Sequence, residues 1–158
     1  MRTYHRSYRL IQISKMLKRN RVVDLASTAK DDVLAEMVDV AATSPYVLDK
    51  QALLQSVRER EQKMTTGIGI GIAIPHAKTN ACTDFVIAIG RKRGGLMYDA
   101  LDGGLVYLVI MIAGPAARYD TYLNIHAKIV LLMACPEFRQ RLINAETTND
   151  IYHLLKGK

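Results

Sequence analysis

The segment from residue 105 to 113 restricts the fold more than any other part of the sequence. It contains six large apolar residues with almost no polar break: Val106, Leu108, Val109, Ile110, Met111 and Ile112. A strand with one face in water alternates apolar and polar side chains, whereas this segment is apolar at both positions of the alternation. We therefore predict a central strand that is covered on both faces.

The residues around this strand predict the elements that cover it. An apolar stripe at helical spacing follows Ser27 and Thr28, either of which could be the N-cap, and a second helix is expected to begin near Asp49. Further helices are predicted over residues 120 to 133, 136 to 145 and 147 to 155, and further strands over residues 22 to 25, 68 to 75 and 84 to 90. This mixture predicts a single α/β domain with a mixed sheet and helices on both faces.

The net charge of +7 is concentrated at the N-terminus. Residues 1 to 21 hold seven of the 22 Lys and Arg and no acidic residue, which leaves 15 basic and 15 acidic residues in the rest of the chain. We therefore predict a solvated basic arm over residues 1 to 12, followed by the domain over residues 13 to 158. Because the body is neutral, binding to nucleic acid would depend on the arm alone, and it is disfavoured.

Metal, redox and membrane functions find no support in the sequence. Cys82 and Cys135 stand far apart with no Cys or His cluster, so we expect reduced, buried cysteines, no metal site and no cofactor. No apolar run approaches the roughly 20 residues that a membrane-spanning helix needs. A soluble, cytoplasmic protein is the expectation.

The sequence TTGIGIGIAIPHAK, residues 65 to 78, carries the strongest functional signal. As one strand, residues 68 to 75 would place isoleucines on one face and leave the glycine face bare. That face could either form the floor of a shallow site that ends at His76 or allow tight packing of the sheet against a helix. The glycine spacing matches neither GxGxxG nor a P-loop, so nucleotide binding is disfavoured.

His76 is the histidine with the most defined setting. It follows a predicted strand and Pro75, whereas His5 lies in the arm and His126 and His153 lie on predicted helices. Pro75 fixes its own φ, which gives His76 a defined exit angle from the strand. A neutral imidazole is a nucleophile that can carry a transferable group, although a purely structural role remains an alternative at this stage.

The sequence resembles the enzyme IIA family of the phosphoenolpyruvate-dependent sugar phosphotransferase system, in its fructose/mannitol and nitrogen-regulatory branch. The resemblance covers about residues 13 to 156 and extends beyond the histidine motif. The motifs are Ile-Ser-Lys-Met-Leu at 13, Arg-Glu-Arg-Glu at 58, Thr-Gly-Ile-Gly-x-Gly-Ile-Ala-Ile-Pro-His ending at 76, Tyr-Asp-Ala-Leu-Asp-Gly at 98 and Pro-Glu-Phe-Arg-Gln-Arg-Leu at 136.

The resemblance implies a role for two residues and questions two others. His76 matches the phosphorylated histidine of the family, and Arg60 matches an arginine near the phosphoryl group, where a guanidinium can bind two oxygens. The family commonly has a polar residue in place of Ile70 and a second active-site histidine in place of Tyr122. His126 lies one helical turn after Tyr122, so either side chain could replace that histidine.

The function implied by the resemblance is that of a phosphohistidine carrier. It would accept a phosphoryl group from the phosphocarrier HPr and pass it to a permease component or hold it as a signal for a regulatory target. We expect the nitrogen-regulatory type rather than a sugar-dedicated one. The alternative is a regulatory module that binds a protein partner around His76 and transfers little, which Tyr122 and Ile70 favour.

Overall fold

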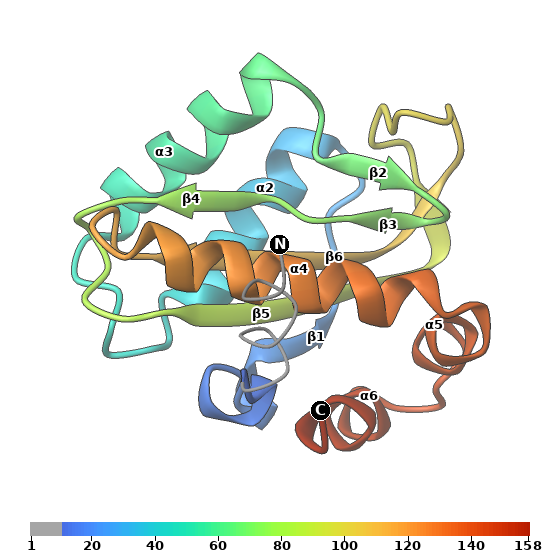
Figure 1. The fold of residues 1–158 in the computed structure, drawn as a ribbon. Helices are drawn as coiled ribbons and strands as arrows, with labels where there is room; N and C mark the ends of the chain where they lie inside the picture. The colour runs from blue at the N-terminus through green and yellow to red at the C-terminus, as the bar shows by residue number, and fades with distance from the viewer. Residues whose placement is uncertain (1–10) are drawn as a thin grey trace, which may run out of the picture.

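The computed structural model describes residues 11 to 158 (Figure 1). The helices and 3-10 turns are η2 Ile13–Lys15, η3 Arg19–Arg21, α2 Lys30–Ala41, α3 Lys50–Lys63, α4 Tyr119–Ala134, α5 Pro136–Ile143 and α6 Thr148–Lys156. The strands are β1 Val22–Asp24, β2 Gly67–Gly69, β3 Ile72–Ala73, β4 His76–Lys78, β5 Val86–Leu96 and β6 Val106–Gly114.

Strand β6 is the centre of one mixed sheet. The strand order is β1-β5-β6-β3-β2, and β4 also pairs with β6, beyond the end of β3. Strand β5 is antiparallel to β6, whereas β3 and β4 run parallel to it. The predicted α/β class and the predicted central strand are confirmed, and β5 continues to Leu96, past its predicted end at residue 90.

The two faces of β6 belong to two separate cores, which explains its unbroken apolar sequence. Val109 and Met111 pack with the buried residues of α2 and α3 on one face. Leu108, Ile110 and Ile112 pack with those of α4, α5 and α6 on the other. Figure 1 shows these two helical layers on opposite sides of the sheet. Every residue of β6 except Tyr107 is buried, so neither face of the strand needs polar side chains.

The basic N-terminal segment is packed against the domain from Ile13 onward. Ile13 and Leu17 are fully buried, and Arg21 donates hydrogen bonds to the carbonyl oxygens of Met16 (3.1 Å) and Ile87 (3.4 Å). The backbone of residues 13 to 21 is therefore packed on the domain, while the side chains of Lys15, Lys18 and Arg19 are exposed. Residues 1 to 10 of the predicted arm lie outside the described residues, and the boundary at residue 12 stays a prediction.

Two expectations for local structure are wrong. The N-cap of α2 is Ala29 rather than Ser27 or Thr28, because the backbone N–H and hydroxyl of Ser27 donate to the Glu36 carboxylate instead (2.9 and 2.8 Å). Cys135 is exposed between α4 and α5, whereas Cys82 is buried as expected.

Residues 68 to 75 form a hairpin rather than one continuous strand. Gly69 pairs with Ile72 across a turn of two residues, Ile70 (φ 56°) and Gly71 (φ 80°), and two positive φ angles are typical of a type I′ turn. The predicted open glycine face is wrong too. A Cβ atom on Gly67 would lie 2.8 Å from the Cα of Ala100, so this glycine allows a neighbouring loop, not a helix or a ligand, to approach closely.

The turn makes a prediction about stability. Ile70 is β-branched, 47% exposed and held in the left-handed region, which costs an L-residue about 1–2 kcal/mol. Ile70→Asn would create Asn-Gly, the preferred type I′ sequence, and should raise the free energy of unfolding by about 1 kcal/mol in urea titrations. Ile70→Val keeps a β-branched residue and should show no gain. An Asn variant no more stable than the native protein would contradict this account of the strain.

Candidate functional site

The candidate site lies where β4 begins beside the middle of the sheet. His76, the first residue of β4, pairs with Ile112 of β6, and the Ile112 N–H donates to the Pro75 carbonyl (3.1 Å). The His76 side chain is 9% exposed. Strand pairing on one side and Pro75 before it therefore fix the backbone that carries the imidazole.

Both ring nitrogens of His76 have a partner, and the partners define the tautomer. Nδ1 lies 2.9 Å from the carbonyl oxygen of Ile74, which can only accept, so Nδ1 carries the proton. Nε2 accepts a hydrogen bond from Nε of Arg60 at 3.1 Å. The lone pair of the imidazole is thus on Nε2 and faces a guanidinium group.

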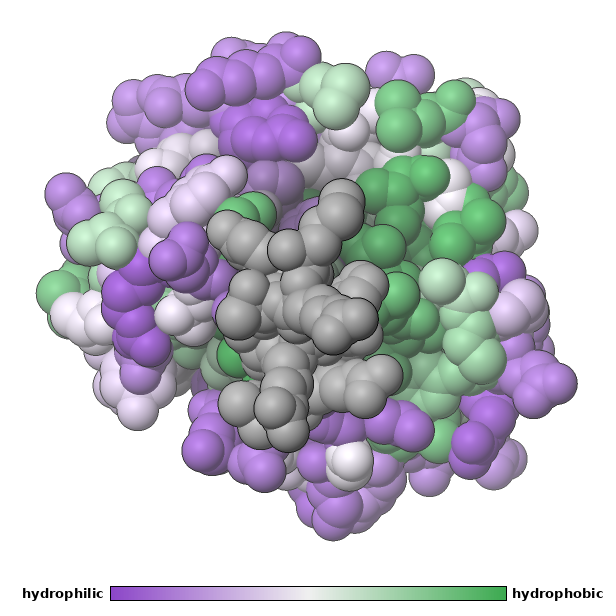
Figure 2. Space-filling model, in the orientation of Figure 1, coloured by the Kyte–Doolittle hydropathy of each residue, from purple (hydrophilic) through white to green (hydrophobic). Residues whose placement is uncertain are grey.

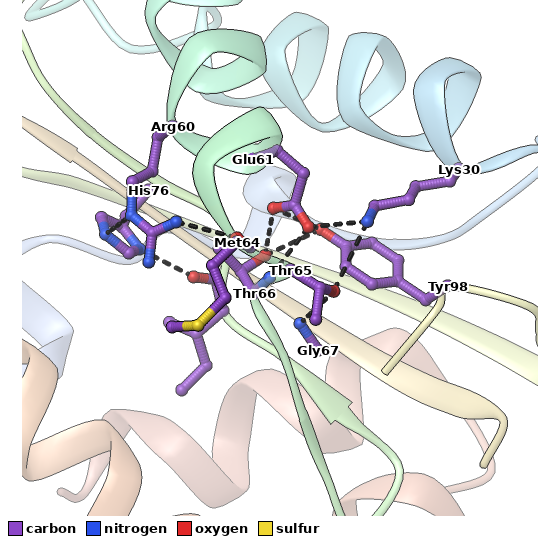
Figure 3. A network of polar contacts seen from close by, with 10 residues as sticks. Lys30, Arg60, Glu61, Met64, Thr65, Thr66, Gly67, His76 and Tyr98 are labelled. Atoms are coloured by element: carbon purple, nitrogen blue, oxygen red, sulfur yellow. Dashed lines mark hydrogen bonds and ion pairs between the residues drawn. The ribbon is translucent and has the colours of Figure 1, made fainter. Parts of the chain in front are cut away.

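Arg60 reaches His76 from the last turn of α3 (Figure 3). The helix begins at the predicted position, because the Asp49 side chain accepts a hydrogen bond from the Ala52 N–H (3.0 Å). Arg60 Nη1 donates to the carbonyl oxygen of Met64 at 2.9 Å, which restricts the rotation of the side chain. Two hydrogen bonds therefore hold the guanidinium group with its Nε edge toward the imidazole.

Helix α4 brings Tyr122 and His126 to the same imidazole. The ring centre of His76 lies 5.4 Å from that of Tyr122 and 5.7 Å from that of His126. The rings of Tyr122 and His126 are 5.9 Å apart, as expected for neighbours one helical turn apart. All four predicted site residues, His76, Arg60, Tyr122 and His126, are thus neighbours in the structure.

Lys78 adds a positive charge that the sequence reasoning missed. It lies two residues after His76 on β4, and side chains two apart share one face of a strand. Its Nζ is 4.3 Å from the centre of the Tyr119 ring and 5.2 Å from that of Tyr122, which are cation–π distances. Two-residue spacing on a strand was the available signal, but the single-strand interpretation of residues 68 to 75 placed Lys78 beyond the strand.

The surroundings keep the imidazoles neutral and the phenol protonated. Burial lowers the pKa of His76 below its ordinary value; the hydrogen bond to Ile74 opposes the change, and the charges of Arg60, His126 and Lys78 add to it. Burial, followed by the charge of Arg60, also lowers the pKa of His126. Burial raises the pKa of Tyr122 to about 12, so its hydroxyl remains a hydrogen-bond donor at neutral pH.

The arrangement combines the neutral imidazole of His76 with two nearby cations, Arg60 and Lys78. A lone pair on Nε2 can attack an electrophile, and Arg60 and Lys78 suit an anionic one. Within residues 11 to 158, no cluster of three His, Cys, Asp or Glu side chains could hold a metal ion. None of the helices formed by these residues has the length and apolar character needed to cross a bilayer.

Comparison with known sequences gives one consistent family. Residues 15 to 158 match the sequence model of the family "Phosphoenolpyruvate-dependent sugar phosphotransferase system, EIIA 2". The chain is 34% identical over 146 residues to the fructose-specific EIIABC component of Bacillus subtilis, covering 92% of this chain and 23% of that protein, so it spans about a quarter of that relative's length. It is 33% identical over 126 residues to the fructose-specific EIIA component of Haloferax volcanii, covering 80% and 82% of the two chains. It is 27% identical over 147 residues to a nitrogen regulatory protein of Pseudomonas aeruginosa, covering 92% and 96%.

Solved structures show the same fold. The nitrogen regulatory protein IIA-Ntr of Neisseria meningitidis superposes with a TM-score of 0.83 at 23% identity, covering 90% of this chain and 98% of that chain. The complex of enzyme IIA for mannitol with phosphorylated enzyme IIB from Escherichia coli contains a chain that matches with a TM-score of 0.73 at 17% identity, covering 90% and 98%.

The charge around His76 makes a prediction about its titration. Arg60→Gln removes the nearest cation, so the pKa of His76 should rise toward its ordinary value of 6.5, as measured by NMR of the imidazole C–H groups. Arg58→Gln is the matched control, because Arg58 lies on the same helix but pairs with Asp31 at 2.7 Å. The lowered pKa also makes the free energy of unfolding depend on pH. The contribution of neutral His76 is fully present above pH 6.5 and is lost as the pH falls through the folded-state pKa, because the unfolded chain binds the proton more tightly. Equal titration of the two variants would show that Arg60 does not influence the ring.

Proposed function

The chain belongs to the EIIA 2 family of the phosphoenolpyruvate-dependent sugar phosphotransferase system, and from this membership we propose that it carries a phosphoryl group on Nε2 of His76. The family makes the protein a component of a phosphotransferase system, whose members transfer phosphoryl groups. The proposed donor is an HPr-like phosphocarrier protein. The observation that supports His76 most directly is its Nε2 lone pair, which faces Arg60 while Nδ1 is held by Ile74.

The transfer step needs little from the protein beyond alignment and charge compensation. The Nε2 lone pair attacks the phosphorus atom of the donor phosphohistidine, and the donor N–P bond breaks as the new one forms. If the donor ring is protonated on its second nitrogen, it leaves as neutral imidazole, and the His76 ring takes up the positive charge. The Nδ1 proton remains in place, and its hydrogen bond to the carbonyl oxygen of Ile74 stabilises that charge.

Arg60 exchanges partners during this step. In the unphosphorylated protein one N–H of its guanidinium group occupies Nε2 of His76. That hydrogen bond has to open when Nε2 attacks, and the same planar group can then donate to two phosphoryl oxygens. The hydroxyl of Tyr122, protonated at neutral pH, is the proposed donor to a third oxygen, with His126 beside it.

An apolar surface supports docking of protein partners. Figure 2 shows one face on which apolar side chains gather over the β2–β3 hairpin and the C-terminal part of α4, bordered by hydrophilic residues. The exposed large apolar residues of the hairpin and of the C-terminal part of α4 are Ile70 and Leu131. Such an area is typical of a protein-binding surface. The proposed receiver is a permease component of the EIIB kind or a regulatory target, and relatives of both the fructose-specific and the nitrogen regulatory kind are similar to the chain.

The second candidate function is a regulatory module with weak transfer. The buried Tyr122 favours it, because a phenol cannot take up a proton or a positive charge as a second histidine could. Both candidates use the same surface around His76. They differ in whether the native protein becomes phosphorylated at a useful rate.

Phosphorylation of His76 is directly testable. With phosphoenolpyruvate, enzyme I and HPr, the native protein should gain one phosphoryl group whose bond is acid-labile, as in phosphoramidates, and His76→Ala should abolish the label because it removes the nucleophile. His153→Ala is the control, because His153 lies on α6, away from the three site rings. Label retained by His76→Ala would assign the acceptor to another residue and contradict the proposal.

A second variant separates the two candidate functions. Tyr122→His should raise the rate of labelling about tenfold, since an imidazole can donate to the phosphoryl group and share its proton, whereas Tyr122→Phe should lower the rate. Rates are measured by rapid quench with the same donor. A native protein that stays unlabelled while Tyr122→His is labelled would establish the regulatory module; a protein that stays unlabelled in both forms would refute the carrier function.

A further inference from the structure

Glu61 is a buried carboxylate next to Arg60 on α3, and it anchors the end of that helix (Figure 3). It is 8% exposed, although it belongs to the uninterrupted charged sequence Arg-Glu-Arg-Glu at 58. Oε1 pairs with Nζ of Lys30 and accepts from the N–H of Thr66, both at 2.8 Å. Oε2 accepts from the hydroxyl groups of Thr66 and, at 3.3 Å, Tyr98. Four donors from three other segments therefore converge on one carboxylate.

The carboxylate is charged in spite of its burial. Burial by itself raises the pKa of Glu61, but the hydrogen bonds from Lys30 and Thr66 and the charge of Lys30 outweigh it, so the pKa lies below its ordinary value. A buried charge is retained only where its partners satisfy it, and removal of one partner is costly. The segment that follows α3 is thus tied to a rigid point.

The backbone of residues 64 to 66 is hydrogen-bonded to Arg60 directly and to His76 through Ile74. The carbonyl oxygen of Thr66 accepts from the N–H of Ile74 (2.9 Å), and the carbonyl oxygen of Ile74 faces Nδ1 of His76 (2.9 Å). The carbonyl oxygen of Met64, two residues before Thr66, accepts from Nη1 of Arg60 (2.9 Å). Arg60 in turn donates to His76 (3.1 Å). Because Arg60 and Glu61 are adjacent on the helix, these hydrogen bonds form a closed circuit.

We propose that Glu61 is a positioning residue for phosphoryl transfer, which acts on both His76 and Arg60 through the backbone of residues 64 to 66. By holding Thr66 it fixes the carbonyl group that orients Ile74 and hence the Nδ1–H tautomer of His76. The same hydrogen bonds to Thr66 also fix the position of the Met64 carbonyl group, which accepts from Arg60. Glu61 itself does not touch the phosphoryl group. The inference rests on the proposed function of His76 as the acceptor.

The test compares Glu61→Gln with Glu59→Gln. The amide keeps the shape of the side chain but has no charge to pair with Lys30 and only one acceptor oxygen. It therefore restrains the backbone of residues 64 to 66 less tightly. Transfer from phospho-HPr to Glu61→Gln should slow by about 10- to 100-fold in kcat, with KM for phospho-HPr within about twofold of the native value, because a small misplacement of reacting groups affects the chemical step. Glu59 is exposed and bonds only to Gln55 among the described residues, so Glu59→Gln should transfer at the native rate.

Two measurements separate positioning from a general structural effect. In nitrogen-15 NMR of the imidazole, the native protein and Glu59→Gln should show one Nδ1–H tautomer for His76, whereas Glu61→Gln should show a mixture. In the double variant with Arg60→Gln, the loss of rate should be smaller than the product of the two single losses, because both substitutions disturb one unit. Rate losses that multiply in the double variant, together with an unchanged tautomer, would overturn the inference.

A pair of substitutions at Thr66 keeps the test decisive if Glu61→Gln does not fold. Thr66→Val replaces the hydroxyl group that bonds Glu61 and Tyr98 by a methyl group and should slow transfer, whereas Thr66→Ser keeps the hydroxyl group and should transfer at the native rate. Thermal unfolding verifies the fold of each variant. Native rates in Thr66→Val would refute the inference. A native protein that is never labelled would instead refute the proposed function, and this outcome is distinguishable because it does not depend on Glu61.

Discussion

The pairing of β4 with β6 is the constraint on which the site depends. Strand β6 is shared along its length: β3 pairs with its first half and β4 with its second, both in the parallel direction. This places His76 opposite Ile112, at a point where the sheet is covered on both faces. The backbone that carries the imidazole is therefore fixed by strand pairing, whereas the partners of the ring come from helices packed on that sheet.

Three elements distant in sequence converge on the imidazole, and each supplies a different property. Helix α3 supplies a fixed cation, β4 supplies the imidazole together with Lys78, and α4 supplies two rings that pack against the imidazole. Burial keeps His76 neutral while positive charge surrounds it. Such a site is poorly matched to a proton and well matched to a group that carries negative oxygens, because only the latter gains from the cations.

The two departures that the resemblance implies, at Tyr122 and Ile70, have different physical meanings. Tyr122 lies against the His76 ring, so the exchange of a histidine for a phenol changes the donor available at the site. Ile70 instead occupies an exposed turn, whose backbone N–H donates to Asp102 at 3.0 Å. A polar residue at this position is explained by the turn, since Asn tolerates positive φ far better than Ile does.

Much of the fold was determined by the sequence alone, because the information is local. The apolar strand at residues 105 to 113, the helical stripes and the motif that ends at His76 each depend on the spacing of neighbouring residues. Spacing also placed Arg60, Tyr122 and His126 as candidates, through the family pattern. Only the tertiary structure decided between a strand and a hairpin at residues 68 to 75. Alternating Ile and Gly suits both, and the hairpin is visible only in the pairing of β2 with β3 and of β3 with β6. The tertiary structure also decided that Glu61 is buried, since a carboxylate in a charged helix end becomes an anchor only when Lys30, Thr66 and Tyr98 arrive from other parts of the chain.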